Sequence, residues 1–116
     1  MPLLGADIEQ ISRIERAISR TPGFTKRVFT GAERTYCEGK GRPAQHYAAR
    51  FCAKEALAKA LGVPLSWQEV EVLRGDQGSP VIRVCGKVRE LLAGRVVRVS
   101  LSHAGDYALA CVLVED

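Results

Sequence analysis

The apolar positions of the chain change their period near residue 9. Residues Leu3–Ile8 suit a short strand, which carries the pattern Gly-x-Asp at Gly5–Asp7. Isoleucines then recur at positions 8, 11, 14 and 18, and these intervals of three and four residues place them on one face of a helix. Thr21-Pro22-Gly23 is a typical helix stop. The pattern therefore predicts a strand over 3–8 and a helix that begins at Glu9.

Two more helices are predicted before the middle of the chain. Thr30–Glu33 has the S/T-x-x-E spacing of a capping box, so a short helix is expected to begin there. Residues Ala44–Leu61 are rich in Ala, Lys, Glu and Leu and are flanked by Pro43 and Gly62, which favours one long helix. The intervening Phe24–Phe29 does not decide between helix and strand.

The second half of the chain has the pattern of two β-hairpins. Extended runs around 70–72 and 81–84 are joined by a turn at Gly75–Ser79, and the runs Arg95–Leu101 and Tyr107–Val114 are joined by residues 102–106. Lys87–Ala93 is long enough for two helical turns. This order predicts an α+β fold, with helices packed on a mostly antiparallel sheet, in a single domain over residues 1–116.

Composition excludes several classes of protein. The chain has 116 residues, of which 47% are hydrophobic and 26% charged, as in an ordinary globular domain. No apolar run approaches the roughly 20 residues of a membrane-spanning helix, and the N-terminus has no basic start of the signal-peptide kind. The net charge of +4 favours an acidic partner or a phosphate-bearing ligand and is too small to indicate nucleic acid. We therefore expect neither a membrane nor a nucleic acid as partner.

The cysteines are widely spaced. Cys37, Cys52, Cys85 and Cys111 form no CxxC pair, and the chain has only two histidines, so the close ligand pairs of a zinc site are missing. Such isolated cysteines are expected to be buried and reduced. A cytoplasmic location follows from this expectation.

Several polar residues could carry chemistry, and each also has a purely structural interpretation. Asp7 stands between a strand and a helix, where a carboxylate can enter a site or cap the helix. Glu55 and Lys59 are four residues apart on the long helix, which is also the spacing of an ordinary surface ion pair. Arg13, with Arg16 and Arg20 further along the same stripe, is either a solvated surface or a contact for an acidic partner.

The last predicted turn carries Ser102, His103 and Asp106. The histidine can bond its own backbone there, or the group can form a phosphate-binding or acid–base site. Spacing alone does not separate these interpretations.

Three segments together resemble a known family. They are LGADIE at 4–9, RFCAKEALAKALG at 50–62, and VSLSH at 99–103 followed by DYA at 106–108. The segment FTKRVFTGAE at 24–33 is similar to a fourth motif of the same family. In order and spacing the chain resembles the holo-acyl-carrier-protein synthases, the small class of 4′-phosphopantetheinyl transferases. The resemblance covers nearly the whole chain.

The chain departs from the family pattern at three positions. Ser79 stands in Gly78-Ser79-Pro80 where the family usually has Lys or Arg, so a basic side chain near the nucleotide is missing. Ala6 replaces a bulkier apolar residue, and Cys52 replaces an alanine. The last two changes concern packing rather than chemistry.

The resemblance implies an enzyme that moves the phosphopantetheine arm of coenzyme A onto a serine of apo acyl carrier protein and releases adenosine 3′,5′-bisphosphate. It implies that Asp7 and Glu55 hold a Mg²⁺ that also binds the coenzyme A pyrophosphate. Two carboxylates are enough for Mg²⁺, which takes its remaining ligands from phosphate and water. Lys59 is expected to reach the pyrophosphate as a point charge. The general base stays open among Asp7, Glu55 acting through a metal-bound water, and His103.

The same resemblance assigns the remaining candidates. It implies a homotrimer with the active site shared between subunits, and Arg13 and Arg20 as contacts for the acidic carrier protein. The residues that it places at the nucleotide of coenzyme A are Arg50, Gly78, Pro80, Ser102 and His103, with Lys59 toward the pyrophosphate. The alternative function is a non-catalytic basic module that binds an acidic protein or RNA.

Overall fold

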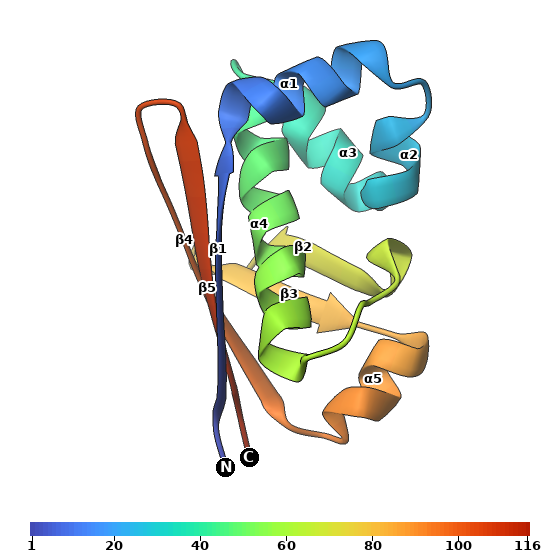
Figure 1. Cartoon of the computed structure of the whole chain (residues 1–116), viewed down its shortest axis with the longest axis vertical. Helices are drawn as coiled ribbons and strands as arrows, with labels where there is room; N and C mark the ends of the chain where they lie inside the picture. Colours follow the sequence, from blue (N-terminus) through green and yellow to red (C-terminus); the bar gives the residue numbers. More distant parts are fainter.

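One long helix packs against two antiparallel sheets in this structure, a computed structural model that describes residues 1–116. Figure 1 shows this helix, α4, beside β1, β5 and β4, with α1 above it, α2 and α3 next to its upper half and α5 at the lower right. The helices are α1 (Ile11–Arg20), α2 (Phe24–Val28), α3 (Gly31–Glu38), α4 (Pro43–Leu61) and α5 (Gly86–Leu92), with a short 3₁₀ turn at Trp67–Glu69. The strands are β1 (Leu3–Gln10), β2 (Val70–Arg74), β3 (Pro80–Val84), β4 (Val96–Ala104) and β5 (Tyr107–Glu115).

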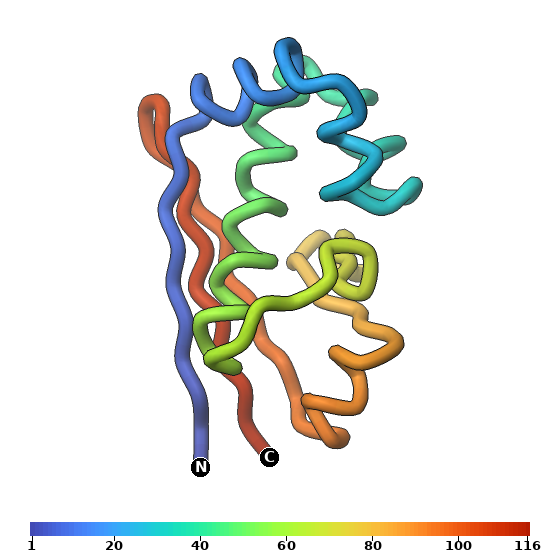
Figure 2. The backbone as a smooth tube through the Cα atoms, turned by 45° about the vertical axis from the view of Figure 1, so that its right-hand side comes forward, coloured from blue at the N-terminus to red at the C-terminus, as the bar shows by residue number.

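The larger sheet joins the two ends of the chain. Its strand order is β1-β5-β4, and β5 pairs in antiparallel fashion with both neighbours, so that Ala110 lies opposite Asp7 on one side and Leu101 on the other. Figure 2 shows the N- and C-termini side by side at the lower end of this sheet. The smaller sheet is the hairpin of β2 and β3, in which Arg74 lies opposite Pro80. The α+β prediction is confirmed.

Helix α4 has clear start and stop residues. Pro43 occupies the first turn, where its missing N–H costs no hydrogen bond, and Gly62 ends the helix in the left-handed region at φ +74°. The helix covers the inner face of the larger sheet, where β5 contributes alternating small buried side chains. Close approach also depends on Gly5 of β1, because a Cβ there would lie 1.9 Å from the carbonyl oxygen of Ala56. A glycine at position 5 thus brings β1 directly against α4.

The outer face of the larger sheet is apolar and uncovered in the single chain. The exposed fraction is 68% for Leu4 and 61% for Ile8 on β1, and 50% for Tyr107 and 42% for Leu109 on β5. Cys111, also on β5, is exposed on the same face. Contiguous apolar surface of this kind is typical of a contact between proteins.

The structure corrects several boundaries predicted from the sequence. Helix α1 begins at Ile11 rather than at Glu9, because β1 stays paired with β5 as far as Gln10. Ile8 is therefore an outward-facing strand residue and does not share the apolar stripe of the other isoleucines. The undecided segment after the first helix is α2. His103 lies within β4, since the hairpin turn contains only residues 105–106.

The cysteine prediction is half right. All four thiols are free, and Cys37 and Cys52 are fully buried, but Cys85 and Cys111 are exposed. Cys85 lies between β3 and α5, and Cys111 is on the uncovered sheet face, so neither is packed within the single chain. Among the helices, none combines the length and the apolar character that crossing a bilayer requires.

Candidate active site

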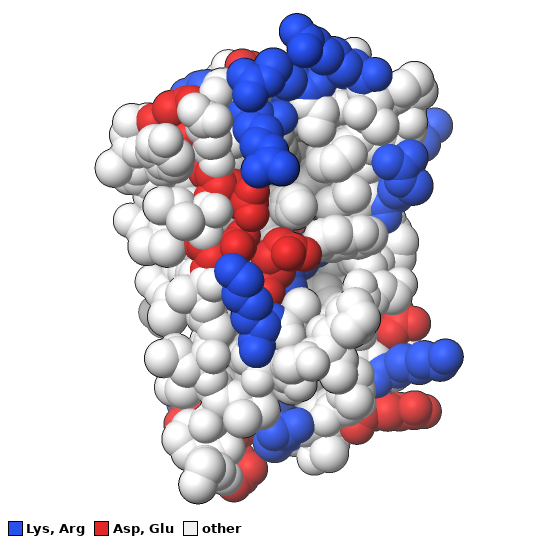
Figure 3. All heavy atoms as spheres, viewed as in Figure 1, with Lys and Arg blue, Asp and Glu red and all other residues white.

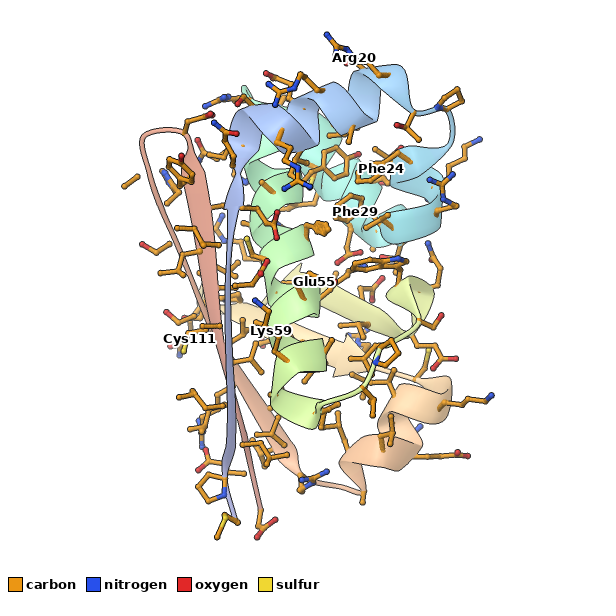
Figure 4. The ribbon with its side chains drawn as sticks, viewed as in Figure 1. Arg20, Phe24, Phe29, Glu55, Lys59 and Cys111 are labelled. Atoms are coloured by element: carbon orange, nitrogen blue, oxygen red, sulfur yellow. The ribbon has the colours of Figure 1, made fainter.

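Asp7 and Lys59 meet where β1 packs against α4. Strand alternation turns Asp7 inward with Gly5, and its exposed fraction is only 8%. The Lys59 Nζ donates a hydrogen bond of 2.9 Å to Asp7 Oδ1. Asp7 Oδ2 is buried and has no hydrogen-bond partner. Figure 4 shows Glu55 one helical turn from Lys59 on α4.

Three carboxyl groups, those of Asp7, Glu9 and Glu55, lie close enough together for the pKa of two of them to be raised. Burial and the charge of Asp7 raise the pKa of Glu55. Burial and the neighbouring Asp7 carboxyl raise the pKa of Glu9 to about 7. The hydrogen bond with Asp7 raises the pKa of Lys59. The site therefore holds more negative charge than its one lysine neutralises.

Glu9 was missed at the sequence level. It lies two residues after Asp7 on the same strand, so both side chains point to the α4 side of the sheet. Once β1 is known to continue beyond residue 8, alternation alone identifies Glu9. The helical period assumed from Glu9 onward hid this signal.

The two structural interpretations considered for this site are wrong. Asp7 does not cap α1, because the N-cap residue is Gln10 and it makes no side-chain cap hydrogen bond. The ion-pair partner of Lys59 is Asp7, not Glu55.

The capping carboxylate of α1 comes instead from the turn between β4 and β5. Asp106 accepts hydrogen bonds from the Ser12 backbone N–H at 3.0 Å and from Ser12 Oγ at 2.6 Å. These bonds and the nearby Arg42 lower the pKa of Asp106. Because the two residues are far apart in the sequence, no local pattern could have identified this cap. It also separates Asp106 from His103, which does not join it in an acid–base group.

A groove beside the carboxylates runs along the end of α4. It has a volume of about 490 Å³ and combines the charged Glu55 and Lys59 with the apolar segment that follows the helix, including Leu65 and Trp67. The groove is therefore charged near β1 and apolar toward the smaller sheet.

A second cavity, of about 170 Å³, lies on a different side of α4, between the β2–β3 hairpin and β4. The structure brings together here all the residues predicted for the nucleotide except Lys59. They are Arg50, Gly78, Pro80, Ser102 and His103. The lining also includes Tyr36, Gln45, His46 and Arg74, which the motifs did not indicate.

Arg50 is a buried cation without a carboxylate partner. Its exposed fraction is 5%, its Nε has no hydrogen-bond partner, and its guanidinium lies 4.2 Å from the centre of the Tyr36 ring. His103 Nε2 lies 3.2 Å from Gln45 Nε2. A buried unpaired cation is costly unless an anion completes it, so this cavity suits a phosphate.

The carrier-facing candidates are also where the spacing predicted them. Arg13, Arg16 and Arg20 are exposed along α1. Figure 3 shows basic side chains over the upper part of the molecule and acidic side chains below them, and Figure 4 shows Arg20 pointing away from the body of the protein.

Comparisons with known proteins identify the family to which the chain belongs and confirm its fold. Residues 3–112 match the family model described as the 4′-phosphopantetheinyl transferase superfamily. The chain is 47% identical to the holo-[acyl-carrier-protein] synthase of Moorella thermoacetica, over 96% of this chain and 91% of that protein. The corresponding enzyme of Geobacter metallireducens is 44% identical, over 96% and 94% of the two chains. The chain belongs to the holo-[acyl-carrier-protein] synthase family.

Solved structures of holo-[acyl-carrier-protein] synthases have the same fold. The enzyme of Bacillus anthracis, in complex with coenzyme A (3′,5′-ADP), superimposes with a TM-score of 0.82 at 33% identity, covering 97% of this chain and 95% of that one. The Helicobacter pylori enzyme in complex with coenzyme A gives 0.87 at 27% identity, covering 97% and 100%. The family resemblance and the expected enzyme class are thereby confirmed.

Proposed function

We propose that this member of the holo-[acyl-carrier-protein] synthase family transfers the 4′-phosphopantetheine group of coenzyme A to a serine of apo acyl carrier protein. The serine oxygen forms a bond to the phosphorus that carries pantetheine, the bond from that phosphorus to adenosine 3′,5′-bisphosphate breaks, and the serine proton is lost. The observation that carries the proposal is the pair of sites on α4. One is a carboxylate site with a free buried oxygen on Asp7, and the other is a cationic cavity around Arg50.

The carboxylate site fits a divalent cation. Asp7 Oδ2 is a buried acceptor without a donor, and burial together with the charge of Asp7 raises the pKa of Glu9 and of Glu55. Asp7 and Glu55 are the residues that would hold Mg²⁺, with oxygens of the pyrophosphate and water as further ligands. Bound Mg²⁺ would offset the charge that builds on the phosphates during transfer.

Lys59 supplies the mobile charge of the site. Its side chain is 56% exposed although its ammonium reaches Asp7, so the ammonium can turn toward a phosphate without unfolding any element. We assign it to the pyrophosphate. At the other end of coenzyme A, we assign Arg50, Ser102 and His103 to the nucleotide phosphate and Gly78 and Pro80 to the wall beside the base.

The two sites support an oligomer with shared active sites, which the family resemblance implies to be a homotrimer. In one chain, α4 lies between the carboxylate site and the cationic cavity, and a helix with its side chains is about 10 Å across. One coenzyme A molecule therefore contacts a carboxylate site and a cationic cavity most directly when the two belong to different subunits. The uncovered apolar face of β1 and β5 would be buried in that assembly. Sedimentation equilibrium tests this, and a mass equal to one chain at micromolar concentration would contradict it.

Helix α1 supports recognition of an acidic carrier. We expect Arg13→Glu and Arg20→Glu each to raise the KM for the carrier about tenfold at low salt, because like charges then meet across the contact. The affinity for coenzyme A should stay the same. Steady-state kinetics at two salt concentrations measures both effects, since exposed charges are screened over about 8–10 Å.

The matched control is Arg89→Glu, which makes the same charge change at an exposed position on α5. If this control raises the carrier KM as much as the α1 variants do, the effect is one of net charge and α1 is not the carrier contact.

The decisive test of the function is mass spectrometry of an apo carrier protein incubated with the enzyme, coenzyme A and Mg²⁺. The expected result is a carrier that gains one phosphopantetheine group, with release of adenosine 3′,5′-bisphosphate, and no gain when the acceptor serine is replaced by alanine. An unmodified carrier that nevertheless binds the protein would favour the alternative function, a non-catalytic module for an acidic protein. If the protein instead binds RNA and leaves the carrier unmodified, the result would favour a non-catalytic RNA-binding module.

A further inference from the structure

The cationic cavity contains a second arginine that no motif indicated. Arg74 is the last residue of β2 and lines the cavity together with Arg50 and His103. Its Nε donates a hydrogen bond of 3.2 Å to the Gly78 carbonyl, and its Nη1 donates one of 3.0 Å to the Tyr36 hydroxyl. These two bonds fix the guanidinium across the β2–β3 turn, although the residue lies at the surface.

Neither arginine of this cavity is neutralised by a carboxylate. The ion pairs of the chain involve other cations, and the cavity lining includes no Asp or Glu. Arg74 and Arg50 contact the same aromatic residue, Tyr36, one at its hydroxyl and the other over its ring. Positive charge therefore converges on one small space.

This positive charge shifts the pKa of two neighbouring groups, Tyr36 and His46. Burial alone would raise the pKa of Tyr36, but the hydrogen bond from Arg74 and the charges of Arg74, Lys40 and Arg50 lower it. Burial lowers the pKa of His46, and the charges of Arg50 and Lys40 lower it further. Both shifts agree with a space that is ready for an anion.

The β2–β3 turn brings no cation of its own to this space. Ser79 is neutral, and Asp76 in the same turn is acidic. Gly78 instead adopts a left-handed backbone at φ +83°, and its carbonyl accepts the hydrogen bond from the Arg74 guanidinium. A planar guanidinium also offers paired donors to phosphate, which an ammonium does not.

We infer that Arg74 binds the 3′-phosphate of coenzyme A and takes the place of the basic side chain that Ser79 does not provide. This inference rests on the proposed function, because it names the residue that selects coenzyme A over its analogue without the 3′-phosphate. Tyr36 is the positioning residue that holds the guanidinium.

The test is calorimetric titration of the full-length protein with coenzyme A and with dephospho-coenzyme A. We expect Arg74→Gln to weaken coenzyme A binding about 10- to 100-fold, the usual effect of losing a hydrogen bond to a charged group. Binding of dephospho-coenzyme A should change less than about twofold. Tyr36→Phe, which frees the guanidinium without removing it, should weaken coenzyme A by a smaller factor, about threefold.

Relocating the charge makes the test specific. In the Arg74→Gln background, Ser79→Arg should restore coenzyme A binding, whereas in the otherwise unchanged protein Ser79→Arg should add little. Arg83→Gln is the matched control. Arg83 is an exposed arginine of the same hairpin, but its side chain lines a different cavity.

Three outcomes would overturn the inference. They are unchanged coenzyme A binding in Arg74→Gln, an equal loss for both ligands, and an equal loss in the Arg83→Gln control. A parent protein that binds neither ligand would instead remove the proposed function and this inference with it. Thermal unfolding of each variant confirms that the exposed substitutions leave the fold in place.

Discussion

Replacing Asp7 by Asn should lower turnover more than about a hundredfold while leaving the protein at least as stable as before. Loss of a residue around a metal ligand typically costs 10–100-fold in affinity or activity, and loss of a direct ligand costs more. The stability part has a different cause. Lys59 pairs only with Asp7 Oδ1, while Oδ2 is buried without a donor. A neutral amide also removes the repulsion from Glu9 and Glu55, which offsets the loss of the half-exposed ion pair.

Glu55→Gln should give the same loss of turnover, and both variants should weaken Mg²⁺ binding in calorimetric titrations in the presence of coenzyme A. Glu15→Gln is the control, because Glu15 is an exposed carboxylate on α1, away from the cluster. Wild-type turnover of either site variant at limiting Mg²⁺ would show that its carboxylate is not a metal ligand. A large loss of stability in Asp7→Asn would return that residue to a structural role.

The second large effect concerns stability. Lys54 and Glu33 are almost completely buried, with exposed fractions of 2% and 0%, and form an ion pair of 2.7 Å. Lys54 Nζ also donates to the carbonyls of Val28, at 2.7 Å, and Trp67, at 3.0 Å. Glu33 Oε2 accepts from the Val72 backbone N–H at 2.8 Å. This pair therefore joins α2, α3, α4 and β2.

Lys54→Met should lower the free energy of unfolding by about 3–5 kcal/mol, because it leaves the Glu33 carboxylate buried without its counter-charge. Urea denaturation measures the loss. The double variant Lys54→Met/Glu33→Gln should be more stable than the sum of the single losses predicts, since coupled groups are not additive. A loss below about 1 kcal/mol in Lys54→Met would show that Glu33 does not depend on Lys54 for a counter-charge.

The sequence predicted those parts of the fold that local patterns determine. Pro43 and Gly62 delimited the long helix almost to the residue, and Thr30 with Glu33 forms the capping box that its spacing indicated. The boundary of β1 was wrong because the isoleucine at position 8 fits both a helical interval and an outward-facing strand position. Pairing with a strand a hundred residues away decides between the two, and no window of local sequence contains that information.

The same distinction between local patterns and distant contacts applies to the candidate site. Motifs identified Asp7, Glu55 and five residues that line the cationic cavity. They did not identify Arg74 or Asp106, whose roles arise from contacts between distant segments: Arg74 reaches α3, and Asp106 caps α1 from the β4–β5 turn. The sequence showed that Ser79 replaces a basic residue of the family pattern. Only the folded hairpin shows that Arg74 lies next to that position.

The pairing of β1 with β5 also orders the assembly of the active site in time. Asp7 lies on a strand whose only partner in the sheet is β5, the last strand in chain order. During synthesis, the helices and Glu55 leave the ribosome well before β5, and the strand that carries Asp7 has no strand to pair with until then. Contacts this distant in sequence form late and slowly. We therefore expect the carboxylate pair to form only after β5 has been synthesised, and a truncation that removes β5 to prevent its formation although both carboxylate residues are retained.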